Sequence, residues 1–149
     1  MALGDPVEAW ARTLELRVAA HVSNLDLIRT IVGAVAMFDD LDLDAVSDCR
    51  LAVDEACNRL ISAAVPGAVL TFVVHRRDDA LVVDVSTMCD RVDLISPDDF
   101  SWHVLRSLTD DVRVFNLGEA TDWPRLVGIS ITTNRAAAPG RGSASGLDE

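Results

Sequence analysis

Hydrophobic and polar residues alternate over residues 14–22. A period of two is typical of a strand that buries one face. Over residues 24–38 the apolar positions recur every three or four residues instead, which predicts an amphipathic helix. Ser23 is the candidate N-cap of this helix. The ordered part of the chain is therefore predicted to begin with a strand and a helix that ends in the acidic turn 39–44.

A second helix and a hairpin are predicted next. Asp44 is the candidate N-cap of a helix that runs to about Val65, where a Pro-Gly pair cannot continue it. Two Val-rich runs, 69–76 and 80–87, lie on either side of three polar residues. This arrangement predicts a hairpin of two strands that are buried on at least one face.

The rest of the ordered chain predicts a loop, a short helix and two more strands. The loop covers residues 88–99, and FSWHVLRSLTDD predicts a helix over 100–111. Alternating runs at 111–117 and 126–134 predict two strands that pair with each other. The element order is β-α-α-β-β-loop-α-β-β. We expect an α+β fold, a two-layer sandwich in which helices cover one face of a mostly antiparallel sheet.

The chain has the length of one domain. It contains 149 residues, of which half are apolar, so it can bury a hydrophobic core. We assign residues 14–133 to this domain and residues 1–13 to an N-terminal arm. Residues 134–149 are rich in Ala, Gly, Ser and Pro and lack hydrophobic periodicity. They are predicted to form a disordered tail.

The charge of the chain narrows the range of partners. The formal net charge is -11 and the isoelectric point is about 4.5, so the mean field repels nucleic acids and anionic membranes. All 13 basic residues are Arg, which excludes sites that need a lysine. No segment reaches the roughly 20 apolar residues that span a bilayer, and the first residues lack a signal-peptide pattern. We expect a cytoplasmic protein that binds neither nucleic acid nor membrane.

The cysteines and histidines do not form a recognisable ligand set. Cys49, Cys57 and Cys89 are odd in number and lack CxxC spacing, which is typical of reduced thiols with structural roles. Cys49 and Cys57 lie about 12 Å apart along one helix, too far for a disulfide. The histidines are scattered along the chain. No metal site is expected.

The second predicted helix carries the most distinctive polar residues. On a helical wheel its apolar residues gather opposite Glu55, so Glu55 points away from the core. Arg59 follows four residues later on the same side. The simplest interpretation is a solvated helix face with one Glu55–Arg59 ion pair, which contributes about 0.3 kcal/mol. The alternative is a catalytic carboxylate.

Two stretches carry a resemblance to a known family. RLAVDEACNRLISAA, residues 50–64, is similar to the family's N-box helix, and SWHVLRSLTDDVRVF, residues 101–115, is similar to the helix and strand after its last glycine box. Together with the element order, they make residues 14–133 resemble the anti-sigma factors of the RsbW and SpoIIAB type, closest to the mycobacterial UsfX branch. Members of this family are switch-protein serine kinases with the histidine-kinase-like (Bergerat, GHKL) ATPase fold.

The resemblance implies a role for Glu55. The family's N-box reads E-A-x-x-N, in which the Glu is the general base toward a substrate serine and the Asn binds the Mg²⁺ of ATP. Glu55 matches the Glu. The Asn position falls on Arg59, which cannot coordinate a metal ion, and Asn58 lies one residue early, about 100° around the helix. Glu55 is therefore a candidate base that we predict to be vestigial.

Both glycine boxes of the family are replaced. Thr87, Cys89 and Arg91 occupy the positions of its D-x-G-x-G motif, and residues 99–102 replace its second box. Side chains thus stand where backbone amides approach the nucleotide in the family. No cofactor is expected, although the resemblance itself implies ATP and Mg²⁺. The degenerate nucleotide pocket is predicted to consist of Asn58, Arg59, Thr87, Cys89 and Arg91.

The helix after the first strand carries a candidate partner-binding residue. In the family, an Arg in a motif like F-A-R-V on this helix contacts the sigma factor and the competing anti-anti-sigma factor. LIRTIV places Arg29 at this position. The alternative is a solvated residue whose stem lies on apolar neighbours. The resemblance favours partner binding, since Arg is enriched in binding hot spots.

Three functional hypotheses follow. The first is a homodimeric anti-sigma factor that sequesters an alternative sigma factor of the stress or sporulation type, is countered by a STAS-type anti-anti-sigma factor, and dimerises through residues 14–22. The second is an active ATP-dependent serine kinase that phosphorylates the anti-anti-sigma factor, with Glu55 as base. The third is redox control through Cys57 or Cys89.

Overall fold

The computed structural model describes residues 11–91, 99–117 and 124–135. The order of the elements is the predicted one, with a short 3-10 helix before the first α-helix. The elements are β1 Thr13–Ala19, η1 Val22–Asn24, α2 Leu25–Phe38, α3 Leu43–Ala63, β2 Val69–Arg76, β3 Ala80–Cys89, α4 Phe100–Leu108, β4 Asp111–Leu117 and β5 Arg125–Asn134.

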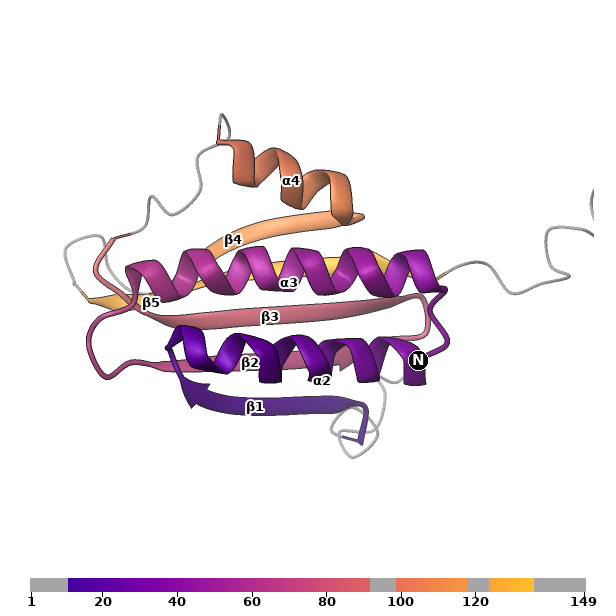
Figure 1. Cartoon of the computed structure of the whole chain (residues 1–149), viewed down its shortest axis with the longest axis horizontal. Helices are drawn as coiled ribbons and strands as arrows, with labels where there is room; N and C mark the ends of the chain where they lie inside the picture. Colours follow the sequence, from indigo (N-terminus) through magenta and orange to yellow (C-terminus); the bar gives the residue numbers. More distant parts are fainter. Residues whose placement is uncertain (1–10, 92–98, 118–123, 136–149) are drawn as a thin grey trace, which may run out of the picture.

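The five strands form one sheet in the order β1-β2-β3-β5-β4, and every pairing is antiparallel. The helices lie on one face of this sheet, with α3 over its middle, α2 on the β1 side and α4 on the β4 side (Figure 1). The predicted two-layer α+β sandwich is confirmed. Among the described helices, none combines the length and the apolar character that crossing a membrane requires.

The core lies between the sheet and α3. Alternate residues of β2 point toward the helices, and Leu70, Phe72 and Val74 are at most 1% exposed. Ala64, the C-cap of α3, is half-buried. On α3 the apolar side of the predicted wheel is buried, and it consists of Val46, Cys49, Val53, Cys57 and Leu60.

The turn between β1 and α2 differs from the prediction. β1 ends at Ala19 instead of Val22, because the chain turns at His21. Ser23 is not the N-cap of α2; its N–H donates to Nδ1 of His21 at 3.1 Å. The N-cap position belongs to Asn24, whose side-chain amide donates to the carbonyl of Ala19 at 2.9 Å. This bond ties the start of α2 to the end of β1.

The start of α3 also differs from the prediction. The N-cap is Asp42 instead of Asp44, and its Oδ1 accepts a hydrogen bond from the N–H of Ala45 at 2.8 Å. Asp40 has a φ of 61°, a left-handed conformation that turns the chain between α2 and α3. This turn decides which residue of the acidic run reaches the cap position.

β3 is longer than predicted and is joined to the end of α3. It runs to Cys89 instead of Thr87, because its last two residues pair with the start of β5. α3 ends at Ala63 instead of Val65, because Ala64 forms an isolated β-bridge with Cys89. The end of the second helix is thus tied to the strand that precedes the predicted loop.

The last elements also differ at their ends. α4 ends at Leu108 instead of residue 111, because the N–H of Asp110 already donates to the carbonyl of Thr132 in the sheet at 2.9 Å. Asn134 belongs to β5. Residues 136–149 lie outside the described residues, so the disorder of the tail stays a prediction.

A buried charge cluster joins α2 to the sheet. The side chain of Asp39, which follows α2, is only 4% exposed. Its Oδ1 accepts from Nε of Arg76 at 2.9 Å and its Oδ2 from Nη2 of Arg135 at 2.8 Å. Arg135 also donates to the backbone carbonyls of Asp39 and Arg77. We call Asp39, Arg76 and Arg135 the Asp39 clamp; it connects the ends of α2, β2 and β5.

Candidate functional site

The predicted Glu55–Arg59 pair forms on the outer side of α3. Nε of Arg59 lies 3.5 Å from Oε1 of Glu55, and the two side chains are 36% and 29% exposed. One helical turn separates the two residues, so their side chains are neighbours on one face. Asn58, one residue earlier, is exposed.

Ser101, in the first turn of α4, completes this group. Its hydroxyl donates to Oε1 of Glu55 at 2.6 Å, and Nη2 of Arg59 donates to the hydroxyl oxygen. Ser101 is only 2% exposed. We call Glu55, Arg59 and Ser101 the α3–α4 cluster. Both the carboxylate and the guanidinium are therefore engaged by the chain's own groups, and α4 is held against α3.

This contact was not predicted from the sequence, where Ser101 is only one of the residues that replace the second glycine box. The sequence does contain one signal of this contact. The small residue Ser101 and the apolar residue Leu105 are one helical turn apart and so share a face of α4. Both are buried in the structure. This spacing indicates that Ser101 faces α3 instead of solvent.

Thr87 and Cys89 make different contacts. Both are fully buried. The hydroxyl of Thr87 donates to the carbonyl of Val69 at 2.8 Å, and the thiol of Cys89 donates to the carbonyl of Thr87 at 3.6 Å. Arg91, just after β3, is exposed. Of the predicted pocket residues, only Arg59 joins the candidate base Glu55 in one hydrogen-bonded group, while Thr87 and Cys89 bond to the sheet.

All three thiols are buried and free. Burial raises the pKa of Cys57 to about 12, with a further contribution from the charge of Asp54. Burial also raises the pKa of Cys49 and that of Cys89 to about 11. The thiolate is the reactive form of cysteine. Because these thiols are protonated at neutral pH, the structure offers no activated cysteine for redox control.

Arg29 projects from α2 toward α3. Its Nη2 donates to Oδ1 of Asp54 at 2.7 Å, and its Nη1 donates to Oδ1 of Asp26 at 3.1 Å. The hydrogen bond to Asp54 and then the charge of Asp54 raise the pKa of Arg29. The Arg29 side chain is still 38% exposed. A guanidinium has five N–H groups, so these two bonds leave three for a partner. We call Arg29, Asp26 and Asp54 the Arg29 cluster.

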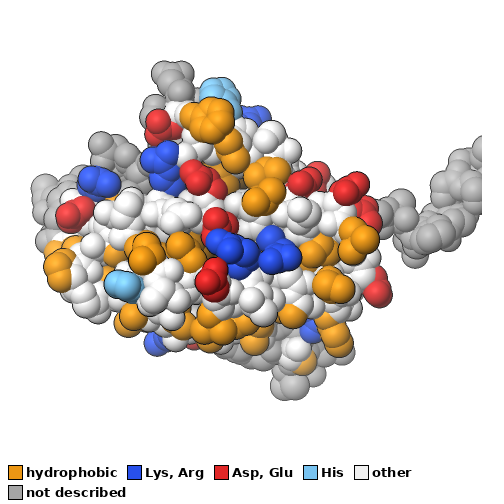
Figure 2. Space-filling view, viewed as in Figure 1, with side chains coloured by type: hydrophobic (Ala, Val, Ile, Leu, Met, Phe, Trp, Pro, Cys, Tyr) orange, Lys and Arg blue, Asp and Glu red, His pale blue; other side chains and the backbone are white. Residues whose placement is uncertain are grey.

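The helix-covered side of the molecule, which we call the helical face, exposes large apolar side chains. Figure 2 shows charged side chains at the middle of this face and hydrophobic side chains distributed around them. Large apolar side chains that are exposed on one face make that face a candidate interaction surface. Those on α2, α3 and α4 that are at least 48% exposed are Leu27, Met37, Phe38, Leu43, Leu51 and Phe100.

Comparison with known proteins places the chain in a family. No family profile matches the chain. Two curated relatives do, both named anti-sigma-F factor RsbW, from Mycobacterium tuberculosis strains CDC 1551 / Oshkosh and ATCC 25618 / H37Rv. Each is 52% identical over 128 residues, which are 85% of this chain and 76% of the relative. The chain belongs to the RsbW-type anti-sigma factor family.

Membership of the RsbW type confirms the resemblance found in the sequence. The 128 matched residues exceed the length of either stretch that carried that resemblance. The identity of this RsbW-type chain with its relatives therefore does not depend on the N-box helix alone.

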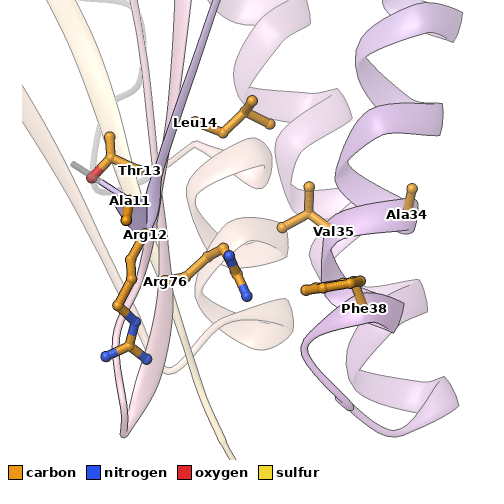
Figure 3. Close-up of a pocket in the computed structure, with 8 residues that line it drawn as sticks. All are labelled: Ala11, Arg12, Thr13, Leu14, Ala34, Val35, Phe38 and Arg76. Atoms are coloured by element: carbon orange, nitrogen blue, oxygen red, sulfur yellow. The ribbon is translucent and has the colours of Figure 1, made fainter. Parts of the chain in front are cut away.

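This RsbW-type chain also has a groove of about 380 Å³ between β1 and α2 (Figure 3). Its walls are mostly apolar and include Leu14 from β1 and Val35 and Phe38 from α2. The guanidinium of Arg76 lies over the Phe38 ring, 5.0 Å from the centroid, in a cation–π contact. Because Arg76 belongs to the Asp39 clamp, one wall of the groove is held by a buried ion pair.

Proposed function

We propose that the chain binds and sequesters an alternative sigma factor of the sigma-F kind and so keeps it from RNA polymerase. Its relatives are named anti-sigma-F factors, and the similarity covers 85% of the chain. The observation that carries the proposal is the Arg29 cluster, a partly exposed guanidinium held by carboxylates from two helices.

The surroundings of Arg29 support this use. Binding hot spots are commonly Arg or aromatic anchors surrounded by contacts that exclude water. The exposed apolar side chains of the helical face supply such surroundings. Two carboxylates also restrict the guanidinium before the partner arrives, so less side-chain entropy is lost on binding.

We further propose that the nucleotide site is degenerate and that sigma-factor binding needs no nucleotide. Glu55 already accepts a hydrogen bond from the Ser101 hydroxyl, and Arg59 already donates a hydrogen bond to the same hydroxyl oxygen. A guanidinium has no lone pair to offer Mg²⁺. The alternative, an active serine kinase with Glu55 as base, requires Ser101 to leave the carboxylate first. Titration calorimetry with Mg·ATP is expected to show no heat of binding. The kinase would be supported if Mg·ATP bound and if the chain transferred phosphate to a STAS-type partner in a reaction that Glu55→Ala abolishes.

A homodimer and a STAS-type competitor complete the proposal. Within the described residues, β1 pairs only with β2, so its other edge is available to a second copy. Leu14 on this strand is 39% exposed. Light scattering should give twice the 16.1 kDa of one chain, and Leu14→Arg should lower that mass. A monomeric parent would contradict the dimer, and a STAS-type factor that binds without displacing the sigma factor would contradict the competition.

Binding of the sigma-F-type factor from the same organism tests the main proposal. The parent chain should bind it and should reduce its association with core RNA polymerase. Arg29→Glu should weaken binding about thirtyfold or more, because a negative charge replaces the positive charge of a hot-spot residue. Arg113→Glu is the matched control, since Arg113 is 79% exposed on β4. Absence of binding by the parent, or an equal effect of both variants, would contradict the proposal.

A further inference from the structure

Arg50 lies beside the Arg29 cluster. It is exposed on α3, one helical turn before Asp54. A Cβ added to Gly33 of α2 would lie 3.0 Å from Cδ and 3.3 Å from Nε of Arg50. The aliphatic stem of Arg50 therefore packs against α2 at Gly33, which has no side chain. Gly33 allows this approach.

The two arginines follow the same seam between α2 and α3. Gly33 is one turn after Arg29 on α2, a rise of about 6 Å, and Arg50 is one turn before Asp54 on α3. Across the seam, Arg29 therefore lies opposite Asp54, and Gly33 lies opposite Arg50. Figure 2 shows arginine side chains gathered at the middle of the helical face, over α2 and α3.

The charges around Arg50 differ from those around Arg29. Arg29 has two carboxylates within ion-pair distance. In the part of the chain that the structure describes, Arg50 forms no ion pair. Its N–H groups are available to a partner without breaking an internal pair.

We propose that Arg50 is a second partner-binding residue and that Arg50 and Arg29 together receive an acidic segment of the sigma factor. This inference rests on the proposed function and names the chemistry of the contact. Carboxylates pair with guanidinium groups through two parallel hydrogen bonds, which gives both attraction and orientation. Arg29 already has two carboxylates of its own, whereas a basic segment would meet Arg50 as a like charge that no paired carboxylate offsets. The mean acidic field of the chain therefore does not describe the surface that the partner meets.

Arg50→Ala in the full chain tests the inference against the same sigma-F-type factor. Affinity should fall about tenfold, and the remaining affinity should depend less on salt concentration, because one charge pair across the interface is lost. The unfolding midpoint in urea should stay at the parent value, which separates binding from stability. Arg113→Ala is the control and should change neither affinity nor salt dependence.

The outcomes separate this inference from the function on which it rests. If Arg29→Glu weakens binding but Arg50→Ala leaves both affinity and salt dependence at the parent values, the inference is wrong and the proposed function stands. If the parent does not bind the sigma factor, both are wrong.

Gly33→Ala provides a second measurement that does not remove a charge. The added methyl group would lie 3.0 Å from Cδ of Arg50 and should displace the stem. Affinity should fall severalfold in the parent and should not fall further in Arg50→Ala, because no stem is left to displace. The helix itself should not weaken, since Ala favours helix more than Gly. An equal loss in both backgrounds would show that Gly33 does not act through Arg50.

Discussion

Helix α2 has an ion cluster near each end, and the two clusters have opposite arrangements of charge. At its C-terminal end, the carboxylate of Asp39 is held by two arginines, at 2.9 and 2.8 Å. Near its N-terminal end, the guanidinium of Arg29 is held by two aspartates, at 3.1 and 2.7 Å. Distances alone do not distinguish the two clusters.

Burial distinguishes them. The Asp39 side chain is 4% exposed, whereas the side chains of Arg29 and Asp26 are 38% and 91% exposed. A buried charge depends on its partners, and removing one of them is strongly destabilising. An exposed pair contributes little to stability because solvent screens it. We therefore assign the Asp39 clamp to the stability of the fold and the Arg29 cluster to binding.

The largest effect is expected from Asp39→Ala. The change leaves two arginine side chains that are 30% and 20% exposed without their carboxylate. Breaking such a buried cluster should lower the free energy of unfolding by about 3 kcal/mol, measured by urea denaturation. Asp78→Ala is the control, because Asp78 is 92% exposed in its pair with Arg12 and should change stability by less than about 0.5 kcal/mol. Equal effects of the two changes would contradict the division by burial.

An intermediate effect is expected from Glu55→Ala, because the α3–α4 cluster lies between the two in exposure. The change removes the acceptor of Ser101, which is 2% exposed, while Arg59 can still reach solvent. The free energy of unfolding should fall by about 1.5 kcal/mol in the same urea assay. Asn58→Ala, on the exposed side of α3, should stay within about 0.5 kcal/mol of the parent. A neutral Glu55→Ala would show that the cluster does not hold α4.

Much of the fold could be predicted from the sequence, because the hydrophobic period is local information. The periods of two and of three to four gave the order of the elements and the layer arrangement. The ends of elements were less accurate. The acidic run 39–44 offers several residues that can cap a helix, and the choice of Asp42 depends on the left-handed turn at Asp40.

The sites could be predicted only where their contacts are local. The Glu55–Arg59 pair follows from its spacing of four residues. The partners of Asp39 are 37 and 96 residues away, and Ser101 is 46 residues from Glu55, so no local pattern shows them. Arg50 was missed for a related reason, since its position depends on a glycine in the preceding helix.

The smallest effect on stability is expected from Asp54→Asn, which tests whether Asp54 positions Arg29 for the partner. The change keeps the shape of the side chain and removes the charge that bonds Nη2 of Arg29 at 2.7 Å. The urea midpoint should stay near the parent value, whereas affinity for the sigma-F-type factor should fall severalfold, because the guanidinium becomes free to leave its orientation. Asp78→Asn is the control and should change neither quantity, since Asp78 is 92% exposed and pairs with Arg12 outside the Arg29 cluster.

A double-mutant cycle decides whether Asp54 acts through Arg29. In an Arg29→Ala background, Asp54→Asn should cause no further loss of affinity, because there is no guanidinium left to orient. The same loss in both backgrounds would show that Asp54 contacts the partner itself. A marked drop in the urea midpoint would show that the Arg29 cluster stabilises the fold as the Asp39 clamp does. Burial would then not distinguish the roles of the two clusters.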